Sequence, residues 1–428
     1  MRETAVSTYE CTSGSRPWFN ARVTSIGQPA TSTPQSPAAG APTAFHFRSF
    51  DGVRGLAILM VIAYHAVSTT AYPDATLGWV RPWLMAGWSG VDLFFGLSGF
   101  LITSLLLREE DRELRAGRPQ HFSLGRFYLR RVFRILPAFY AVFALDACLL
   151  SHYPFVPSAG LREIEHSALG LLPYGTFWSN YMISYGPRWA GHTVLLPREA
   201  YSVFWSLCVE EHFYLLWPVF LVLVKRTSVR VAVSLAVCLT LPALRHLAIA
   251  SGWDQPLAVH FASHYRLDSI LWGGLAALVA GRIAWRDSTR RLLLGAGAAL
   301  IALLLLTNTM SVRPIGRPLG FSAGFSLLAL TTAILLLELT RRPNTWLCRL
   351  LEFRPLVAVG RVSYGMYLLH LPVMDLAMVL LFAVPRRPTI LNLGMAIVYF
   401  WFVTFAAAQL LYHLVEKRFL ALKDRYFH

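Results

Sequence analysis

Apolar residues dominate the chain in long runs separated by short polar segments that contain arginine. A membrane-spanning helix needs about 20 mostly apolar residues. The pattern therefore predicts an all-α polytopic membrane protein. Its ten predicted transmembrane helices are residues 53–70, 88–107, 133–150, 204–224, 229–250, 265–281, 292–308, 319–339, 362–383 and 393–414. An eleventh apolar stretch, 164–183, is interrupted by Pro173, by glycines and by polar residues.

The distribution of arginine predicts how these spans are oriented, because cytoplasmic loops of membrane proteins carry an excess of positive charge. The segment 108–134 contains eight arginines and the loop 225–230 reads KRTSVR, so both are predicted to be cytoplasmic. The span 133–150 then runs outward and the span 204–224 returns. We therefore expect 164–183 to pack in or on the outer leaflet, and both termini to be cytoplasmic.

Composition supports a membrane protein and argues against two other classes. Hydrophobic residues make up 55% of the 428 residues and charged residues only 14%, which disfavours a soluble globular protein. The net charge of +16 lies in short segments between apolar runs, so it indicates cytoplasmic loops rather than nucleic-acid binding. The five cysteines are scattered, with none at CxxC spacing, and imply neither disulfides nor a zinc site. We expect a multi-pass protein of the inner (plasma) membrane.

The chain divides into three predicted parts. Residues 1–47 are rich in Ser, Thr, Pro, Ala and Gly and lack the continuous apolar segment of a secretory signal peptide. They are predicted to be a disordered cytoplasmic tail. Residues 48–420 are predicted to form the transmembrane domain, and residues 421–428 a short cytoplasmic tail.

The first predicted span begins DGVRGLAILMVIAYHA and carries ionisable residues at regular positions. Arg54 and His65 are eleven positions apart, which at about 100° per residue places them on one stripe of the helix, roughly 16 Å apart along its axis. Asp51 stands three residues before Arg54, a spacing that allows an ion pair. A histidine inside a span is costly and titrates near neutral pH, so His65 is a candidate general base. Arg54 by itself also fits a positive-inside anchor.

Two other segments place charged groups where they are unusual. FYLRRVFRILP, residues 127–137, puts Arg131 and Arg134 on one helix face at the cytoplasmic rim. Paired guanidiniums suit phosphate groups there, although a generic basic flank has the same appearance. Glu210 belongs to a Glu-Glu-His run near the outer end of its span, which is difficult to reconcile with exposure to lipid. We therefore predict a functional role for Glu210 or its neighbour.

Four further polar residues are supporting candidates. Asp92 stands just inside the outer end of the second span and could orient a catalytic histidine. Asp268 and His370 are isolated on apolar helices, where a hydrogen-bonding role in packing competes with a functional one. Ser98 lies in GLSG, whose spacing differs from the GxSxG nucleophile elbow, and the two glycines of this motif indicate close helix packing. No HExxH or phosphate-loop motif occurs in the sequence, so no metal site is predicted.

Six segments, in order, resemble the signature segments of the membrane-bound acyltransferase-3 family. They are FDGVRGLAILMVIAYHA, GVDLFFGLSGFLIT, FYLRRVFRILPAFY, WSLCVEEHFYLLWP, YRLDSILWGG and SYGMYLLHLP. The family includes O-antigen and peptidoglycan O-acetyltransferases and acyltransferases that modify macrolide sugars. The resemblance implies a ten-helix fold that moves an acyl group, such as acetyl, from cytoplasmic acyl-CoA to a hydroxyl, usually on a carbohydrate.

The resemblance also implies roles for particular residues. The family's Arg-x10-His motif falls on Arg54 and His65, its arginine pair on Arg131 and Arg134, and its glutamate motif on Glu210. The arginines would hold the phosphates of acyl-CoA, a co-substrate rather than a permanently bound cofactor. His65 would act as a general base or be acylated itself, with Glu210 or another carboxylate orienting its ring.

Some members of the family carry a C-terminal hydrolase-like domain outside the cytoplasm. Here the chain is expected to be a stand-alone member, in which the handling of the acceptor is absent or is supplied by a partner protein. A transporter or flippase for a glycan or lipid-linked precursor stays open as an alternative, because buried ionisable residues can also form a proton or substrate path. A non-catalytic sensor or scaffold is a third class. The lack of visible internal repeats disfavours a repeat-built transporter.

Overall fold

A computed structural model of the chain describes residues 47–69, 78–117, 122–152, 168–189, 203–254, 256–282, 286–306, 320–381 and 389–427. All regular secondary structure within these ranges is helical, so the predicted all-α class is confirmed. The predicted tail 1–47 lies outside the described residues except for Phe47, and the predicted tail 421–428 continues the last helix up to Phe427.

The longer helices each have at least 17 residues. They are α1 (Arg48–Thr69), α4 (Gly90–Arg115), α5 (Leu124–His152), α10 (Phe204–Leu223), α11 (Thr227–Ala250), α13 (Ser263–Val279), α14 (Asp287–Leu306), α15 (Phe325–Arg341), α18 (Ser363–Leu381) and α19 (Ile390–Leu411). The shorter elements are η2 (Gly78–Val80), α3 (Arg81–Met85), η3 (Ala86–Ser89), α7 (Ala168–Gly175), α8 (Ser179–Trp189), α12 (Pro256–Phe261), η4 (Gly320–Gly324), α16 (Trp346–Leu351), α17 (Arg354–Arg361), η5 (Tyr412–Glu416) and α20 (Lys417–Phe427).

Each predicted span overlaps one of the longer helices, but fewer of them meet the requirements for crossing a bilayer. By length and hydropathy, six helical segments of the described chain can cross, or seven if the α17–α18 pair, bent by 76°, is one broken span. The six are Arg48–Ser68, Gly78–Arg115, Phe204–Leu223, Thr227–Ala250, Ser322–Arg341 and Ile390–Tyr426. The helices α5, α13 and α14 are not among them. The count of ten spans therefore stays a prediction.

The stretch 164–183 does not form one long helix. The described part contains α7, of 8 residues, and α8, of 11 residues, which continues to Trp189. The chain turns between them at Phe177, whose φ of 60° lies in the left-handed region. Because a helix rises 1.5 Å per residue, neither segment is long enough to cross about 30 Å of hydrocarbon. This agrees with the prediction that the stretch does not span.

Close backbone contact between helices builds the centre of the bundle. A Cβ atom placed on Gly99 of α4 would lie 2.0 Å from the carbonyl oxygen of Ile270 in α13, and one on Gly273 would lie 2.0 Å from that of Gly96. Small residues at such interfaces let two helices approach closely in a membrane, where packing rather than hydrophobic burial drives association. The packing role predicted for the glycines of GLSG is confirmed.

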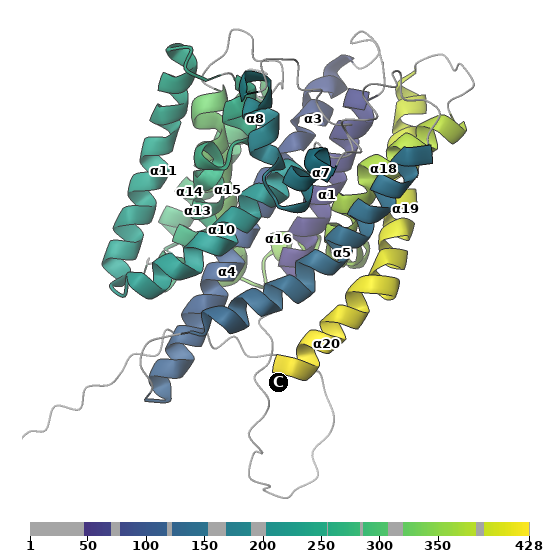
Figure 1. Cartoon of the computed structure of the whole chain (residues 1–428). Helices are drawn as coiled ribbons and strands as arrows, with labels where there is room; N and C mark the ends of the chain where they lie inside the picture. The colour runs from purple at the N-terminus through teal and green to yellow at the C-terminus, as the bar shows by residue number, and fades with distance from the viewer. Residues whose placement is uncertain are drawn as a thin grey trace, which may run out of the picture.

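The helices pack side by side into a bundle with two distinct ends (Figure 1). The C-terminal end of α4, the start of α5 and the C-terminal α20 lie toward one end, whereas α3 and α8 lie toward the opposite end (Figure 1). The elements at the first end carry the basic segments 108–134 and 417–425, which the sequence predicts to be cytoplasmic.

Candidate functional site

The helix α1 carries the two residues of the predicted stripe. The Arg54 guanidinium donates a hydrogen bond of 3.0 Å to the Asp51 carboxylate, so the ion pair predicted from their spacing is confirmed. His65 lies three helical turns further on, and its Nδ1 is 2.9 Å from the carbonyl oxygen of Val61. A carbonyl oxygen can only accept, so Nδ1 carries the hydrogen and Nε2 of the neutral ring carries the lone pair.

Three arginines from two helices gather on one side of α1. Arg54 of α1 lies within electrostatic range of Arg134 of α5. Arg134 is also within electrostatic range of Arg131, on the same helix. Arg54 and Arg131 both attract Glu210 of α10. We call Arg54, Arg131 and Arg134 the arginine cluster. Like charges held this close are stabilised by anions, and guanidiniums are well suited to phosphate groups.

The two arginines that α5 contributes to the cluster, Arg131 and Arg134, make few contacts with the protein. The Arg131 guanidinium lies over the Tyr214 ring at 5.2 Å and over the Phe127 ring at 5.7 Å. Neither Arg131 nor Arg134 donates a hydrogen bond to the part of the chain that the structure describes. Their N–H groups therefore remain available to an anionic ligand.

Glu210 is held by two hydroxyl groups. Ser98 of α4 donates to one carboxylate oxygen at 3.1 Å, and Tyr214 of α10 donates to the other at 2.7 Å. The two hydroxyl oxygens lie 3.0 Å apart, so the three side chains form a closed group. The structure thus brings Glu210 and Ser98 together, a contact that the sequence analysis did not predict. It places Glu210 near the arginine cluster and not against the ring of His65. The i,i+4 spacing of Glu210 and Tyr214 was the available signal.

His65 stands beside the second predicted histidine, His370 of α18. Their ring centroids are 4.9 Å apart and the planes meet at 61°. His370 is fully buried, with Nδ1 2.6 Å from the carbonyl oxygen of Tyr367 and with no hydrogen-bond partner at Nε2 among the described residues. By the same carbonyl argument, both neutral histidines have their lone pair at Nε2. The sequence named both residues but did not predict that they pack together.

Two of the supporting candidates belong to buried ion pairs instead. Asp92 accepts a hydrogen bond of 2.8 Å from Arg266, so its carboxylate is directed to an arginine rather than to a catalytic histidine. Asp268 receives two bonds from Arg245, at 2.8 and 2.9 Å, and is fully buried. These contacts give both aspartates a structural role in joining helices. Sequence reasoning missed both arginines as their partners.

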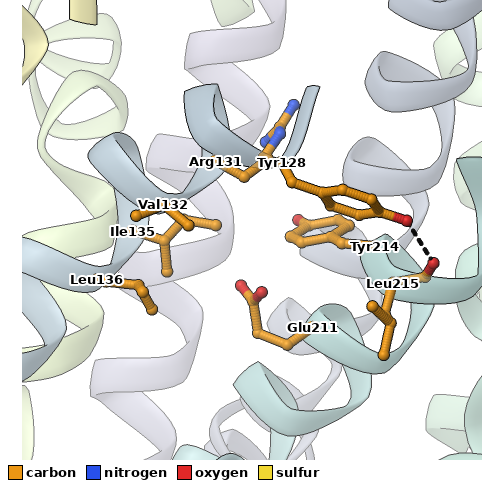
Figure 2. A pocket seen from close by; sticks show the side chains of 8 residues that line it. All are labelled: Tyr128, Arg131, Val132, Ile135, Leu136, Glu211, Tyr214 and Leu215. Atoms are coloured by element: carbon orange, nitrogen blue, oxygen red, sulfur yellow. Dashed lines mark hydrogen bonds between the residues drawn. The ribbon is translucent and has the colours of Figure 1, made fainter. Parts of the chain in front are cut away.

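A pocket of about 110 Å³ opens between α5 and α10 beside the arginine cluster. Figure 2 shows the Glu211 carboxylate pointing into the space between the aliphatic side chains of α5 and the Tyr214 ring, with the Tyr128 hydroxyl bonded to the Leu215 carbonyl oxygen at 2.8 Å. The lining residues are Tyr128, Arg131, Val132, Ile135, Leu136, Glu211, Tyr214 and Leu215. Of the two adjacent glutamates, Glu210 thus faces the interior hydroxyls and Glu211 faces this pocket.

One acidic residue near the cluster was missed by sequence reasoning. Glu416 ends the π-helix η5 and lies within electrostatic range of Arg134. Its Oε1 atom is buried with no hydrogen-bond partner among the described residues. A π-helical turn is uncommon and often marks a functional position, but the sequence around Glu416 carries no local signal for it.

The fold and the site define a polytopic helical membrane protein with a basic cluster and a histidine pair, and its first long helix, α1, contributes Arg54 to the cluster and His65 to the pair. Comparison with known proteins gives the family. A family model described as "Acyltransferase domain" matches residues 47–412, and the chain belongs to that family.

Two relatives show how far the similarity extends. The chain is 27% identical over 343 residues to the peptidoglycan O-acetyltransferase OatA of Listeria monocytogenes, which covers 77% of this chain and 49% of that protein. It is 26% identical over 330 residues to the O-acetyltransferase OatA of Staphylococcus aureus, which covers 76% of this chain and 50% of that protein. The chain thus spans about half the length of these relatives. No solved structure matches it.

Proposed function

We propose that this protein is an O-acyltransferase of the inner membrane, with ten spans and cytoplasmic termini. It transfers an acyl group, such as acetyl, from acyl-CoA to a hydroxyl of a carbohydrate-containing acceptor. Membership of the acyltransferase family and the names of the O-acetyltransferase relatives support the reaction class. A sugar hydroxyl is the proposed acceptor class, and the name of the Listeria relative, a peptidoglycan O-acetyltransferase, supports it.

The arginine cluster is the proposed binding site for the phosphates of acyl-CoA. The observation that carries this proposal is that three guanidinium groups lie near one another while two of them form no hydrogen bond with the described chain. Arg54, Arg131 and Arg134 approach one another across two helices, yet Arg131 and Arg134 donate no hydrogen bond to the described chain. Arg54 also starts the stripe of α1 that ends at His65, so a flexible thioester arm would have to extend roughly 16 Å along this helix to reach that residue.

His65 is the proposed general base. Its Nε2 takes the proton of the acceptor hydroxyl while the hydroxyl oxygen attacks the thioester carbonyl carbon. The carbon–sulfur bond then breaks, and the thiolate of CoA leaves and takes up the proton. His370 is a positioning residue in this scheme, because its ring packs at 4.9 Å against His65 and restricts the orientation of that imidazole. Glu210 is proposed to hold the arginine cluster in place through its attraction to Arg54 and Arg131.

The test is cleavage of acetyl-CoA and of longer acyl-CoAs by the purified protein, followed as free thiol with and without an oligosaccharide acceptor. We expect acceptor-dependent thiol release and a matching mass increase of the acceptor. Removal of a general base costs about 10²–10⁴-fold, so His65→Ala should lower kcat by that order while leaving CoA binding intact. Full transfer by a folded His65→Ala protein would contradict the assignment. A wild-type protein that moves a glycan across vesicles without cleaving thioester would instead be a transporter.

A further inference from the structure

The helix α8 lies at the end of the bundle opposite α20 (Figure 1). Four aromatic side chains gather there. Tyr181 and Tyr185 lie one turn apart on α8, and His264 approaches them from the start of α13. The three ring planes lie within 20° of one another, with centroids 5.8 to 6.3 Å apart. Trp178 lies 5.4 Å from Tyr181, and its side chain is 56% exposed. We call Trp178, Tyr181, Tyr185 and His264 the ring platform.

A directional chain of hydrogen bonds fixes the rings of the platform. Tyr185 and Tyr265 both donate to the same oxygen of Asp254, at 3.2 and 2.7 Å. Because the Tyr185 hydrogen is committed to this carboxylate, its oxygen accepts from Nε2 of His264 at 3.4 Å. Nδ1 of that ring then accepts from the Tyr181 hydroxyl at 3.3 Å. The chain ends at Tyr181, whose oxygen faces the Ser263 hydroxyl and the backbone N–H of His264.

Hydrogen bonds also attach the platform to α10, the helix that carries Glu210. Asn180 of α8 donates to the Ser263 hydroxyl at 2.8 Å, and that hydroxyl lies 2.7 Å from Nδ1 of His212. The His212 ring packs at 5.2 Å against Trp178. The platform is therefore tied to α10, which also carries Glu210 and Tyr214 beside the arginine cluster.

This arrangement differs from a band of interfacial aromatic residues. Tyr and Trp at a membrane surface anchor a helix by partitioning, which needs no fixed orientation of the rings. Here a buried carboxylate, Asp254, is 6% exposed and receives the hydroxyls of Tyr185 and Tyr265. Burying a carboxylate costs free energy that hydrogen bonds must offset, and this network uses it to align the rings. Near-parallel apolar faces edged by hydroxyls and imidazole nitrogens match a sugar, which has an apolar C–H face and a hydroxyl rim.

We propose that the ring platform is a saccharide-binding subsite, which holds a sugar unit of the acceptor other than the one that is acylated. This inference rests on the proposed function for the identity of the acceptor, but binding at the platform does not require acyl transfer. The sugar stacks on Tyr181, Tyr185 and Trp178.

The experiment measures equilibrium binding of two defined oligosaccharides, chitotetraose and maltotetraose, to the full-length protein in nanodiscs by calorimetry, without acyl donor. We expect the wild type to bind at least one of them. Loss of one ring contact should weaken that binding by about three- to tenfold in Tyr181→Ala and in Trp178→Ala. Tyr181→Phe keeps the ring and should lose less affinity than Tyr181→Ala. Trp79→Ala, which removes another exposed aromatic side chain, should leave the affinity unchanged.

Each outcome decides the question. Binding of neither sugar to the wild type, or equal binding by the wild type and a Tyr181→Ala protein with an unchanged unfolding temperature, would overturn the platform as a subsite. Equal losses in Trp79→Ala and Trp178→Ala would show a general membrane effect and would also overturn it. His65→Ala should bind the sugar normally. Sugar binding without thioester cleavage in the wild type would therefore contradict the proposed function while leaving the platform in place.

Discussion

Two regions of the bundle use arginine in opposite ways. Where α11, α13 and α15 meet, Arg245 is fully buried and all five of its N–H groups are paired, with Asp268, with the Ser326 hydroxyl and with the carbonyl oxygens of Tyr265 and Ser322. Beside α1, in contrast, Arg131 donates no hydrogen bond to the described chain. A guanidinium whose N–H groups are all hydrogen-bonded within the protein has no donor left for a ligand. A guanidinium with free N–H groups can still donate to one.

Residue type alone does not show this difference in hydrogen bonding. Arg230 repeats the first arrangement, since it binds Glu110 through two bonds of 2.8 Å and also donates to two carbonyl oxygens. These pairs join helices in a medium where an unpaired charge is costly. The arginine cluster faces Glu210 and Glu416 only at longer electrostatic range. The same residue type therefore stabilises the bundle in one region and forms the proposed phosphate site in the other.

The largest effect, on stability, is expected from removing the buried ion pair between Arg245 and Asp268. Arg245→Met leaves Asp268 as an unpaired buried carboxylate, and loss of one partner of a buried pair costs about 3–5 kcal/mol. We expect a clear drop in the unfolding temperature measured in detergent, with unchanged CoA affinity in the protein that remains folded. The double variant Arg245→Met/Asp268→Leu removes both charges and should recover much of the stability. A single variant as stable as the wild type would contradict the structural role of this pair.

The second effect concerns the histidine pair, His65 and His370. His370→Ala removes the ring that packs against His65, and misplacement of a catalytic group by about 1 Å costs on the order of 100-fold. We expect kcat to fall by that order, with little change in the KM for acyl-CoA. His370→Phe restores a ring of similar size and should recover most of kcat. If Phe behaves like Ala, the Nε2 atom of His370, not its packing, contributes to the reaction.

How much of this the sequence could predict depends on whether the interaction is local. The Asp51–Arg54 pair and the shared stripe of Arg54 and His65 follow from helical periodicity, so they could be predicted. The pairing of Asp92 with Arg266, 174 positions away, depends on how α4 and α13 pack, and no local pattern encodes it. Because no local signal indicates Arg266 as its partner, Asp92 was expected to orient a histidine instead.

The same limit applies to the site and to the number of spans. Glu416 reaches the arginine cluster only because η5 returns the chain to α5, so its neighbours in sequence gave no signal. The apolar runs located the helices correctly, because hydropathy is a local property. They did not establish ten crossings, since α13 has only 17 residues and a span needs about 20.

The third effect tests the arginine cluster directly. Arg131→Met and Arg134→Ala each remove a guanidinium from the proposed phosphate site, and we expect CoA to bind about tenfold more weakly, or roughly 1.4 kcal/mol. The loss should shrink at high salt, because screening weakens the attraction between phosphate and the remaining arginines. Arg130→Ala is the matched control, since Arg130 adjoins Arg131 but points about 100° away around the helix. Equal losses in Arg130→Ala and Arg131→Met would show a general charge effect instead of a defined site.

The smallest effect is expected at the hydroxyls that hold Glu210. Ser98→Ala and Tyr214→Phe each remove one hydrogen bond to a carboxylate, which is worth about 1.5–3 kcal/mol at most and less where solvent replaces it. We expect CoA affinity to fall by about two- to fivefold in each, because a looser Glu210 orders Arg54 and Arg131 less well. The two hydroxyls lie 3.0 Å apart and share one carboxylate, so the double variant should lose less than the sum of the single losses. Strict additivity in this double-mutant cycle would mean that Ser98 and Tyr214 act on Glu210 independently. The closed group of three side chains would then contribute no coupling energy.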